Sequence, residues 1–239
     1  MPVMTPIGGT LTGILGGLVS DLRIRLRDNP TDTSLRKWAD NELILFLDEG
    51  QYELCRRAKV IEDRTTAAVC TITLATGYSS YTLHSKIVDV NEDAVFSYDG
   101  SLMKKRTLKW LDENRPTWRD ETGRPTDFVI TSDNKILVTP TPTVTYNTKT
   151  ISLVVKRLPL LDLSVSNTTP EVPVGYYEEM RIWALHLAYL KQDAETKNDS
   201  KAIYYEKQFA LRVGDIIPAN IERIERTEPD NLQIGIYRG

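Results

Sequence analysis

Residues 110–142 read WLDENRPTWRDETGRPTDFVITSDNKILVTPTP and combine a turn rich in breakers with two short apolar runs. Gly123 and Pro125 interrupt any helix that begins near the two tryptophans. The two short apolar runs that follow are expected to be paired strands over residues 127–131 and 135–139. Patterns with helical periodicity lie on both sides of this stretch. The chain is therefore expected to be a helical body that carries a β insertion.

Four segments outside the insertion have the periodicity of amphipathic helices, at about residues 10–27, 40–59, 176–190 and 200–213. Asp40 is expected to cap the second of them. We expect the four helices to form one antiparallel bundle, because each has a single apolar stripe. The expected buried residues are Leu11, Ile14, Leu15, Leu18, Leu22, Leu43, Phe46, Leu47, Leu54, Ala58, Tyr176, Met180, Trp183, Ala184, Leu187, Leu190, Tyr205, Phe209 and Val213.

Three glycines share another face of the first predicted helix, namely Gly9, Gly13 and Gly17. Glycines spaced by four residues allow a second helix to approach closely. Each interior glycine also costs about 1 kcal/mol of helix propensity. This face therefore predicts either a contact with another helix or subunit, or a weak first helix.

Between the helices the period changes to two from Thr65 onward, and Asp99 with Gly100 predicts a two-residue hairpin turn. Thr107 is expected to cap a short helix. The predicted strands make an antiparallel sandwich or small barrel. Their expected segments are 65–74, 81–83, 87–90, 94–98, 127–131, 135–139 and 150–157.

These patterns divide the chain into four parts and define an α+β protein. Residues 1–62 hold the first two helices of the bundle, 63–160 the inserted β domain, and 161–215 the last two helices. Residues 216–239 have too few large apolar side chains for a core of their own. We expect them to form an extended C-terminal tail that is disordered or ordered by a partner.

The charge balance excludes a protein that grips phosphates, because 30 basic residues face 33 acidic ones and the net charge is -3. The charge balance is still compatible with a protein that surrounds nucleic acid or lets it pass without binding it. Residues 1–20 lack the basic start of an export signal, and no apolar run is long enough to span a membrane. Cys55 and Cys70 are expected to be buried, reduced thiols.

No catalytic, metal or cofactor site is expected in this chain. It contains neither a phosphate-binding loop, nor a dinucleotide glycine fingerprint, nor a paired-histidine zinc motif. Its two histidines, His84 and His186, are expected to be structural. The sequence therefore offers no combination of nucleophile, base and oxyanion donor that could form an active site.

The aromatic and basic residues of the opening stretch allow two interpretations. Trp110 and Trp118 beside Arg115, Arg119 and Arg124 could stack on sugars or bases, as aromatic platforms next to cations do. Pro116, Gly123 and Pro125 in the same stretch also fit a rigid turn whose tryptophans cover a small sheet. We favour the packed turn.

The order of these elements resembles the head-to-tail adaptor, or gatekeeper, proteins of short-tailed bacteriophages. The resemblance covers residues 10–213 as a sequence of elements and not as one diagnostic motif. It is carried by Asp40 to Ile44, Leu54 to Arg57, Tyr81 to Leu83, Trp110 to Asp112, Gly123 to Pro125, Ile136 to Val138, Pro140, Pro142, Arg157, Pro159, Tyr176 to Leu190, Ala202, Tyr204 to Glu206 and Phe209.

The resemblance implies a structural virion protein that forms a dodecameric ring between the portal and the tail nozzle or tube. The ring would surround exiting viral DNA without binding it specifically. Its subunits would be made in the cytoplasm of the bacterial host and have no membrane partner. The alternative from the residues is a carbohydrate- or peptide-binding β module on a helical stalk.

The resemblance also implies two sets of contact residues. The segment expected to bind the portal is Asn231, Leu232, Gln233, Ile234, Gly235, Ile236, Tyr237, Arg238 and Gly239. The residues expected to face the tail component, on two exposed loops, are Arg115, Trp118, Arg119, Arg124, Tyr146 and Asn147.

Overall fold

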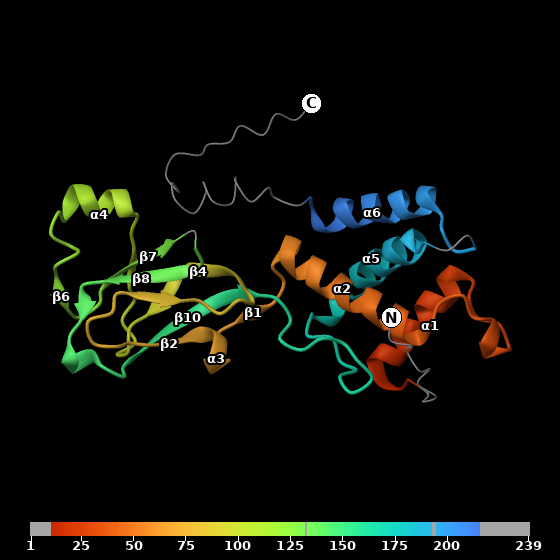
Figure 1. The fold of residues 1–239 in the computed structure, drawn as a ribbon, viewed down its shortest axis with the longest axis horizontal. Coiled ribbons are helices and arrows are strands. Elements are labelled where there is room, and N and C mark those ends of the chain that lie inside the picture. Colours follow the sequence, from red (N-terminus) through yellow and green to blue (C-terminus); the bar gives the residue numbers. More distant parts are fainter. Residues whose placement is uncertain (1–10, 132, 193–194, 216–239) are drawn as a thin grey trace, which may run out of the picture. The chain divides into compact units, whose positions relative to one another are not determined.

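The chain folds as a mixed α+β protein in a computed structural model that describes residues 11–131, 133–192 and 195–215 (Figure 1). Its described residues form two compact units. The helical unit contains residues 11–61 and 157–215, and the strand unit contains residues 62–156. The α+β class predicted from the sequence is confirmed.

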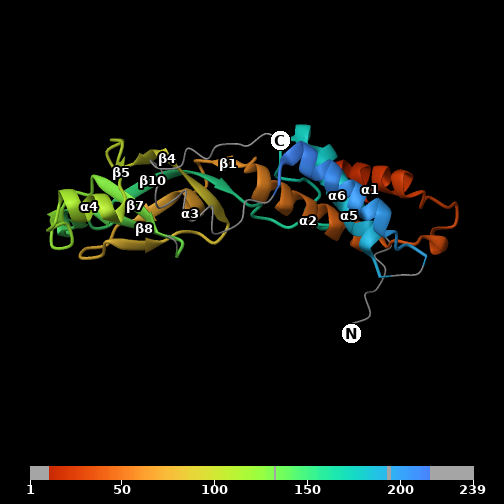
Figure 2. The ribbon, with the colours of Figure 1, turned by 90° about the horizontal axis from the view of Figure 1, so that it is seen from above.

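The four predicted helices are present in the helical unit. They are α1 (Gly13–Leu26), α2 (Asp40–Ala58), α5 (Tyr177–Leu190) and α6 (Asp199–Val213), with short 3-10 turns η1 (Thr33–Leu35) and η3 (Val174–Tyr176). Helix α5 packs against α1, α2 and α6, and lies alongside α6 in both Figures 1 and 2. All four contribute side chains to one apolar core.

The position of α5 between three helices explains where the predicted apolar stripe was wrong. Met180 and Ala184 are buried as expected, but Tyr176 and Leu190 are exposed. A helix with neighbours on several sides is buried over more than one stripe. Ile182 is therefore buried as well, although it lies off the predicted stripe. Ile14 on α1 and Ala58 on α2 are likewise exposed, contrary to prediction.

The start of α2 differs from the prediction that Asp40 caps it. The capping residue is Ala39, whose backbone N–H donates to the Glu42 carboxylate at 2.8 Å. Asp40 is the first helical residue, and its carboxylate accepts a hydrogen bond from Arg23 of α1 at 2.5 Å. The side chain that was expected to cap its own helix instead joins two helices.

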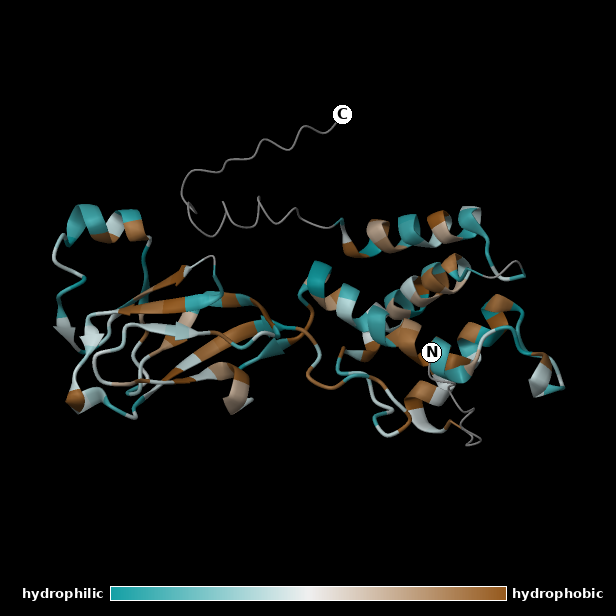
Figure 3. Cartoon of the chain, in the orientation of Figure 1, coloured by the Kyte–Doolittle hydropathy of each residue, from teal (hydrophilic) through white to brown (hydrophobic). Residues whose placement is uncertain are grey.

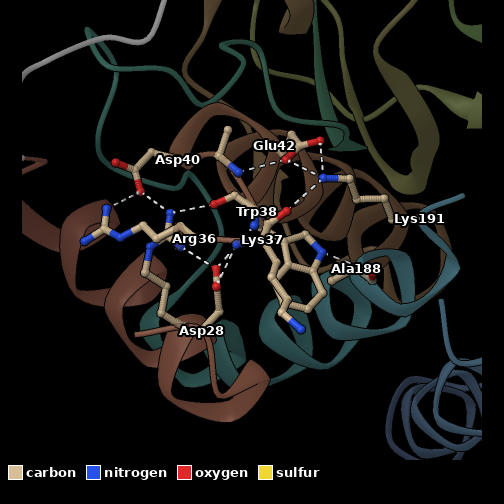
Figure 4. A network of polar contacts seen from close by, with 10 residues as sticks. Asp28, Arg36, Lys37, Trp38, Asp40, Glu42, Ala188 and Lys191 are labelled. Carbon is tan, nitrogen blue, oxygen red and sulfur yellow. Dashed lines mark hydrogen bonds and ion pairs between the residues drawn. The ribbon is translucent and has the colours of Figure 1, made fainter. Parts of the chain in front are cut away.

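The segment between α1 and α2 is fastened to α5 by polar contacts, as Figure 4 shows. Asp28 accepts from the backbone N–H of Lys37 at 2.8 Å. The Trp38 indole N–H donates to the carbonyl of Ala188 at 3.2 Å, and the Lys191 ammonium donates to the carbonyl of Lys37 at 3.0 Å. These contacts hold an irregular segment against the end of a helix far away in sequence.

Both cysteines are free and buried, as predicted. Burial raises the pKa of the Cys55 thiol to about 12, and the nearby Glu171 carboxylate adds to this increase. A thiol with such a pKa stays protonated at neutral pH, and the protonated form is a poor nucleophile.

On the glycine face of α1, a β-carbon at Gly17 would meet no atom within 4 Å, and one at Gly13 would lie 3.5 Å from the hydroxyl oxygen of Thr168, which is not in a helix. The close helix approach lies instead at Gly50 of α2, where a β-carbon would lie 2.8 Å from the backbone oxygen of Met180 in α5. A contact between the glycine face of α1 and another subunit stays a prediction.

We expect Gly50→Ala to destabilise the helical unit and Gly17→Ala to stabilise it. At Gly50 the overpacking costs about 1–3 kcal/mol, which exceeds the ~1 kcal/mol of helix propensity that alanine gains. At Gly17 only the gain applies. Thermal unfolding followed by circular dichroism at 222 nm measures both. An increased midpoint for both variants would contradict the close α2–α5 contact.

The strand unit contains ten strands and two short helices among its described residues. The helices are α3 (Ala67–Cys70) and α4 (Leu108–Asn114), and a 3-10 turn, η2, spans Val144–Tyr146. The strands are β1 (Glu62–Asp63), β2 (Thr71–Thr73), β3 (Ser80–Thr82), β4 (Ile87–Phe96), β5 (Lys104–Lys105), β6 (Thr122–Gly123), β7 (Asp127–Thr131), β8 (Lys135–Thr139), β9 (Thr141–Pro142) and β10 (Thr150–Arg157).

These strands form three small sheets. One has the order β1-β10-β2, with β4 also paired to β10, the second has the order β3-β8-β7-β5, and the third is the pair β6-β9. The prediction of a purely antiparallel arrangement was wrong, because β5 pairs with β7 and β6 with β9 in parallel. Residues 67–70, predicted as strand, form a helical turn, and β4 is continuous where two strands were expected.

Several local predictions in the strand unit are confirmed. Strands β7, β8 and β10 have the predicted bounds. Thr107 caps α4, and its hydroxyl accepts from the backbone N–H of Trp110 at 3.1 Å. A turn forms at Asp99 and Gly100, with Gly100 at a φ of 79° that favours glycine. Its loop is longer than the predicted two residues, because the Ser97 N–H donates to the carbonyl of Ser101 at 2.8 Å.

Candidate functional site

Three segments of the strand unit meet at one surface site. They are the turn that holds Tyr98 and Asp99, the loop that holds Arg124, and the loop that holds Tyr146. We call the six residues that make these contacts the loop cluster. The loop cluster consists of Tyr98, Asp99, Ser101, Arg124, Tyr146 and Lys149.

Arg124 connects two of the segments through charge-assisted hydrogen bonds. Its guanidinium donates to the Asp99 carboxylate at 2.5 Å and to the Ser101 hydroxyl at 2.6 Å. The hydrogen bonds from Ser101, and then the charge of Arg124, hold the pKa of Asp99 below its usual value of 3.8. The carboxylate is therefore ionised at neutral pH and keeps Arg124 in place.

Aromatic contacts add the third segment. The rings of Tyr98 and Tyr146 lie 5.8 Å apart, and the guanidinium of Arg124 lies 5.7 Å from the Tyr98 ring. The Lys149 ammonium approaches the same ring at 5.8 Å. Tyr98 thus lies at the centre of the loop cluster, although sequence reasoning did not assign it. An aromatic residue next to an Asp-Gly turn was the only local signal.

The loop that holds Asn147 also contacts the segment before β3. The Asn147 side-chain oxygen accepts from the backbone N–H of Thr76 at 3.3 Å, and Gly77 donates to the carbonyl of Pro142 at 2.9 Å. Tyr78 and Val144 are exposed there, at 66% and 76%. Large exposed apolar side chains of this kind are suited to contact with another protein.

Trp118 does not belong to any exposed surface, so its assignment as a contact residue was wrong. Its side chain is buried against Leu111 and Val129, and its indole N–H donates to Asp112 at 2.9 Å. Arg119 covers the ring, with its guanidinium 4.3 Å from the ring centre. Trp118 is the packed residue of a rigid turn and has no open face for a sugar or base.

Arg115 also serves the turn itself. Its guanidinium donates to Glu121 and, at 3.1 Å, to the buried carboxylate of Asp127. Arg119 and Asn147 are exposed, whereas Arg124 and Tyr146 are half-buried within the loop cluster. The structure therefore brings Arg124 and Tyr146 together and leaves Arg115 and Trp118 as supports of the loop.

The loop cluster is thus a set of polar and aromatic contacts between three loops of the strand unit. The model of the SU10 adaptor protein family matches residues 15–232, which include most of both units. The chain belongs to this family. SU10 adaptor proteins are phage head-to-tail adaptors, a structural family and not a family of enzymes. No individual curated protein matches the chain.

The histidines of this adaptor are placed in structural positions. His186 is buried in α5, with its Nδ1 atom 2.9 Å from the carbonyl oxygen of Ala202 in α6 and its ring 4.8 Å from that of Trp183. His84 accepts from the backbone N–H of Lys86 at 3.2 Å. Within the described ranges, no three His, Cys, Asp or Glu side chains gather as metal ligands would.

The segment expected to bind the portal, Asn231 to Gly239, lies outside the described residues. Among the described helices, none has the length and apolar character needed to cross a membrane. Of the residues expected to contact a partner, those that the structure describes lie in the strand unit.

We expect the packed turn around Trp118 to loosen in acid. The Arg119 hydrogen bond, and then the Trp118 indole, hold the pKa of Asp112 below its usual 3.8. A lowered pKa means that the ionised carboxylate stabilises the turn above the unfolded pKa, and that this stabilisation is lost as the pH falls through the folded pKa. The indole N–H resonance of Trp118 should therefore move only below pH 3.8.

Asp112→Asn provides the control for this titration, because the amide cannot ionise. Its Trp118 resonance should stay constant over the same acid range. A wild-type transition centred above the usual carboxyl pKa would contradict the assignment to Asp112.

Proposed function

We propose that this adaptor forms a ring of twelve subunits between the portal and the tail nozzle or tube of a bacteriophage. The ring lines part of the channel through which DNA leaves the virion. The observation that carries the proposal is the family match over residues 15–232. The subunits are made in the cytoplasm of the bacterial host and act at the head–tail interface.

In this proposal the helical unit is a four-helix bundle that forms the body of the ring, and the strand unit is an inserted domain. The chain leaves the helical unit after Ile61 and re-enters it at Arg157. The backbone N–H of Arg157 donates to the carbonyl of Ile61 at 3.1 Å, which supports an insertion between these two residues. We assign the domain boundaries after residues 62, 160 and 215. Limited proteolysis that cuts near these positions would support them.

The exposed and half-buried loop residues of the strand unit, chiefly Arg119, Arg124, Tyr146 and Asn147, contact the tail component. Residues 231–239, which lie outside the described residues, bind the portal. The net charge of -3 suits a channel that DNA must leave quickly. Each phosphate neutralised by a basic side chain would add affinity and slow its passage.

Electron microscopy of the protein mixed with purified portal rings tests the proposal. We expect a second ring stacked on each portal. A variant that ends at residue 230 should lose this stacking and keep its circular dichroism spectrum. Portal rings that remain bare with the full chain would refute the adaptor assignment, and stacking by the shortened chain would refute the portal-binding segment.

A further inference from the structure

A hollow of about 380 Å³ opens on the strand unit beside the loop cluster. Its apolar lining comes from Leu102, Met103, Trp110 and Pro125. Met103 and Pro125 are buried, while Leu102 is 56% exposed. A leucine exposed at the mouth of an apolar hollow is available to a side chain from another molecule.

The charged groups of the hollow are arranged around one buried carboxylate. Asp127 accepts from the Nε atom of Arg106 at 2.9 Å, from Arg115 at 3.1 Å and from the Thr126 hydroxyl at 2.7 Å. These three donors satisfy Asp127, and Arg115 is further neutralised by Glu121. The charge of the buried carboxylate is thus balanced by the protein itself.

Arg106 and Lys104 retain free hydrogen-bond donors at the hollow. The Arg106 guanidinium lies 3.9 Å from the ring centre of Trp110, which fixes its plane. Among the described residues, nothing accepts from the two terminal nitrogens of Arg106 or from the Lys104 ammonium. A planar guanidinium with two free nitrogens matches a carboxylate in geometry and charge.

The covered aromatic rings at the hollow favour a peptide as its occupant over nucleic acid or sugar. Single-stranded nucleic acid and sugars need an open aromatic face on which to stack. Here the Trp110 face is covered by Arg106, and Trp118 is buried. A peptide that carries a carboxylate next to an apolar side chain can use both the free donors and the apolar lining of the hollow.

We propose that this hollow binds an acidic segment of the tail component, with a carboxylate on Arg106 and Lys104 and an adjacent aliphatic side chain on Leu102 and Met103. The inference rests on the proposed function for the identity of the partner, because the hollow shares Ser101 with the loop cluster. The chemistry of the occupant follows from the hollow alone.

A peptide titration on the isolated full chain tests the chemistry. The probe is acetyl-Gly-Ser-Leu-Asp-Glu-Gly-Ser-amide, and its matched control replaces the two acids with Asn and Gln. Binding is followed by calorimetry and by quenching of Trp110 fluorescence. We expect saturation with a Kd on the order of 0.1–1 mM and at least about tenfold weaker binding of the amide peptide.

Three variants locate the binding. Lys104→Gln changes an exposed side chain without a described partner, so the fold is preserved, and it should weaken binding about fivefold. Arg106→Gln should weaken binding at least about tenfold. Lys109→Gln, an exposed lysine that does not line the hollow, should bind within about twofold of wild type.

The remaining outcomes would overturn the inference. These are equal binding of both peptides, no saturation by about 10 mM, a Lys104→Gln variant that binds like wild type, or tighter binding of short oligo-dT. A synthetic peptide of residues 227–232, which contains Glu228, Asp230 and Leu232, would assign the hollow to the chain's own tail if it bound more tightly than the probe.

The partner is tested separately on portal–adaptor rings. The Lys104→Gln, Arg106→Gln double variant should stack on portals like wild type and fail to retain the tail component. Normal tail retention would overturn the choice of partner. Bare portals would instead refute the proposed function, while the peptide titration, which needs no portal, would still report on the hollow.

Discussion

Replacement of Arg23 by methionine is expected to lower the free energy of unfolding of the helical unit by about 3–5 kcal/mol. Arg23 donates to Asp28 at 2.7 Å and to the carbonyl of Trp38 at 3.0 Å, and both charged side chains are almost fully buried. Methionine fills similar space but leaves the Asp28 carboxylate buried with backbone donors alone (Figure 4). Urea unfolding monitored at 222 nm measures the loss.

Arg25→Met on the same helix is the matched control. Arg25 forms a bidentate pair with Glu178 of α5 at 2.8 and 2.9 Å, but its side chain is 39% exposed. Solvent screens such pairs, so the expected loss stays below about 1 kcal/mol. Equal losses for the two variants would show that burial of the Asp28 pair does not determine its contribution.

The second large effect is expected at Phe209, the fully buried aromatic residue of α6. Its ring lies 4.9 Å from that of Trp183 and 5.1 Å from the Arg57 guanidinium. Phe209→Ala removes both contacts and leaves a cavity, which costs about 3–5 kcal/mol. Amide hydrogen exchange across residues 199–213 should accelerate most, because α6 has its main packing partner in α5.

Leu211→Ala on the same helix tests whether this effect comes from burial. Leu211 is 79% exposed, and α6 alternates hydrophilic and hydrophobic stretches in Figure 3. The stability of this variant should stay within about 0.5 kcal/mol of wild type. If the amide hydrogens of α6 exchange at the wild-type rate in Phe209→Ala, the packing of Phe209 does not stabilise this helix.

The local structure of this adaptor was accessible from its sequence because short-range chemistry fixes it. Strands β7 and β8 are short apolar runs bounded by Pro125 and Pro140. The start of α4 follows from the Thr107 hydroxyl, and the turn at Gly100 from a positive φ. Each of these features depends on residues only a few positions apart.

The candidate site was predicted only in part, because its contacts join residues from different segments of the chain. The loops that hold Arg124 and Tyr146 were named, but their meeting point at Tyr98 joins residues far apart in sequence. Trp118 was assigned to the surface because a proline-rich turn is usually exposed. Its contacts with Leu111 and Val129 could be seen only once the turn was folded onto the sheet.

The sequence by itself determined the α+β class, the order of helices and strands, and the absence of known catalytic motifs, because periodicity and turn chemistry act locally. Only the tertiary structure decided which glycine receives a neighbouring helix, which tryptophan is buried, and how Arg106 keeps free donors over Trp110. Gly50 meets Met180, Trp118 packs on Val129 and Arg106 is held by Asp127, so these properties depend on contacts between different segments of the chain.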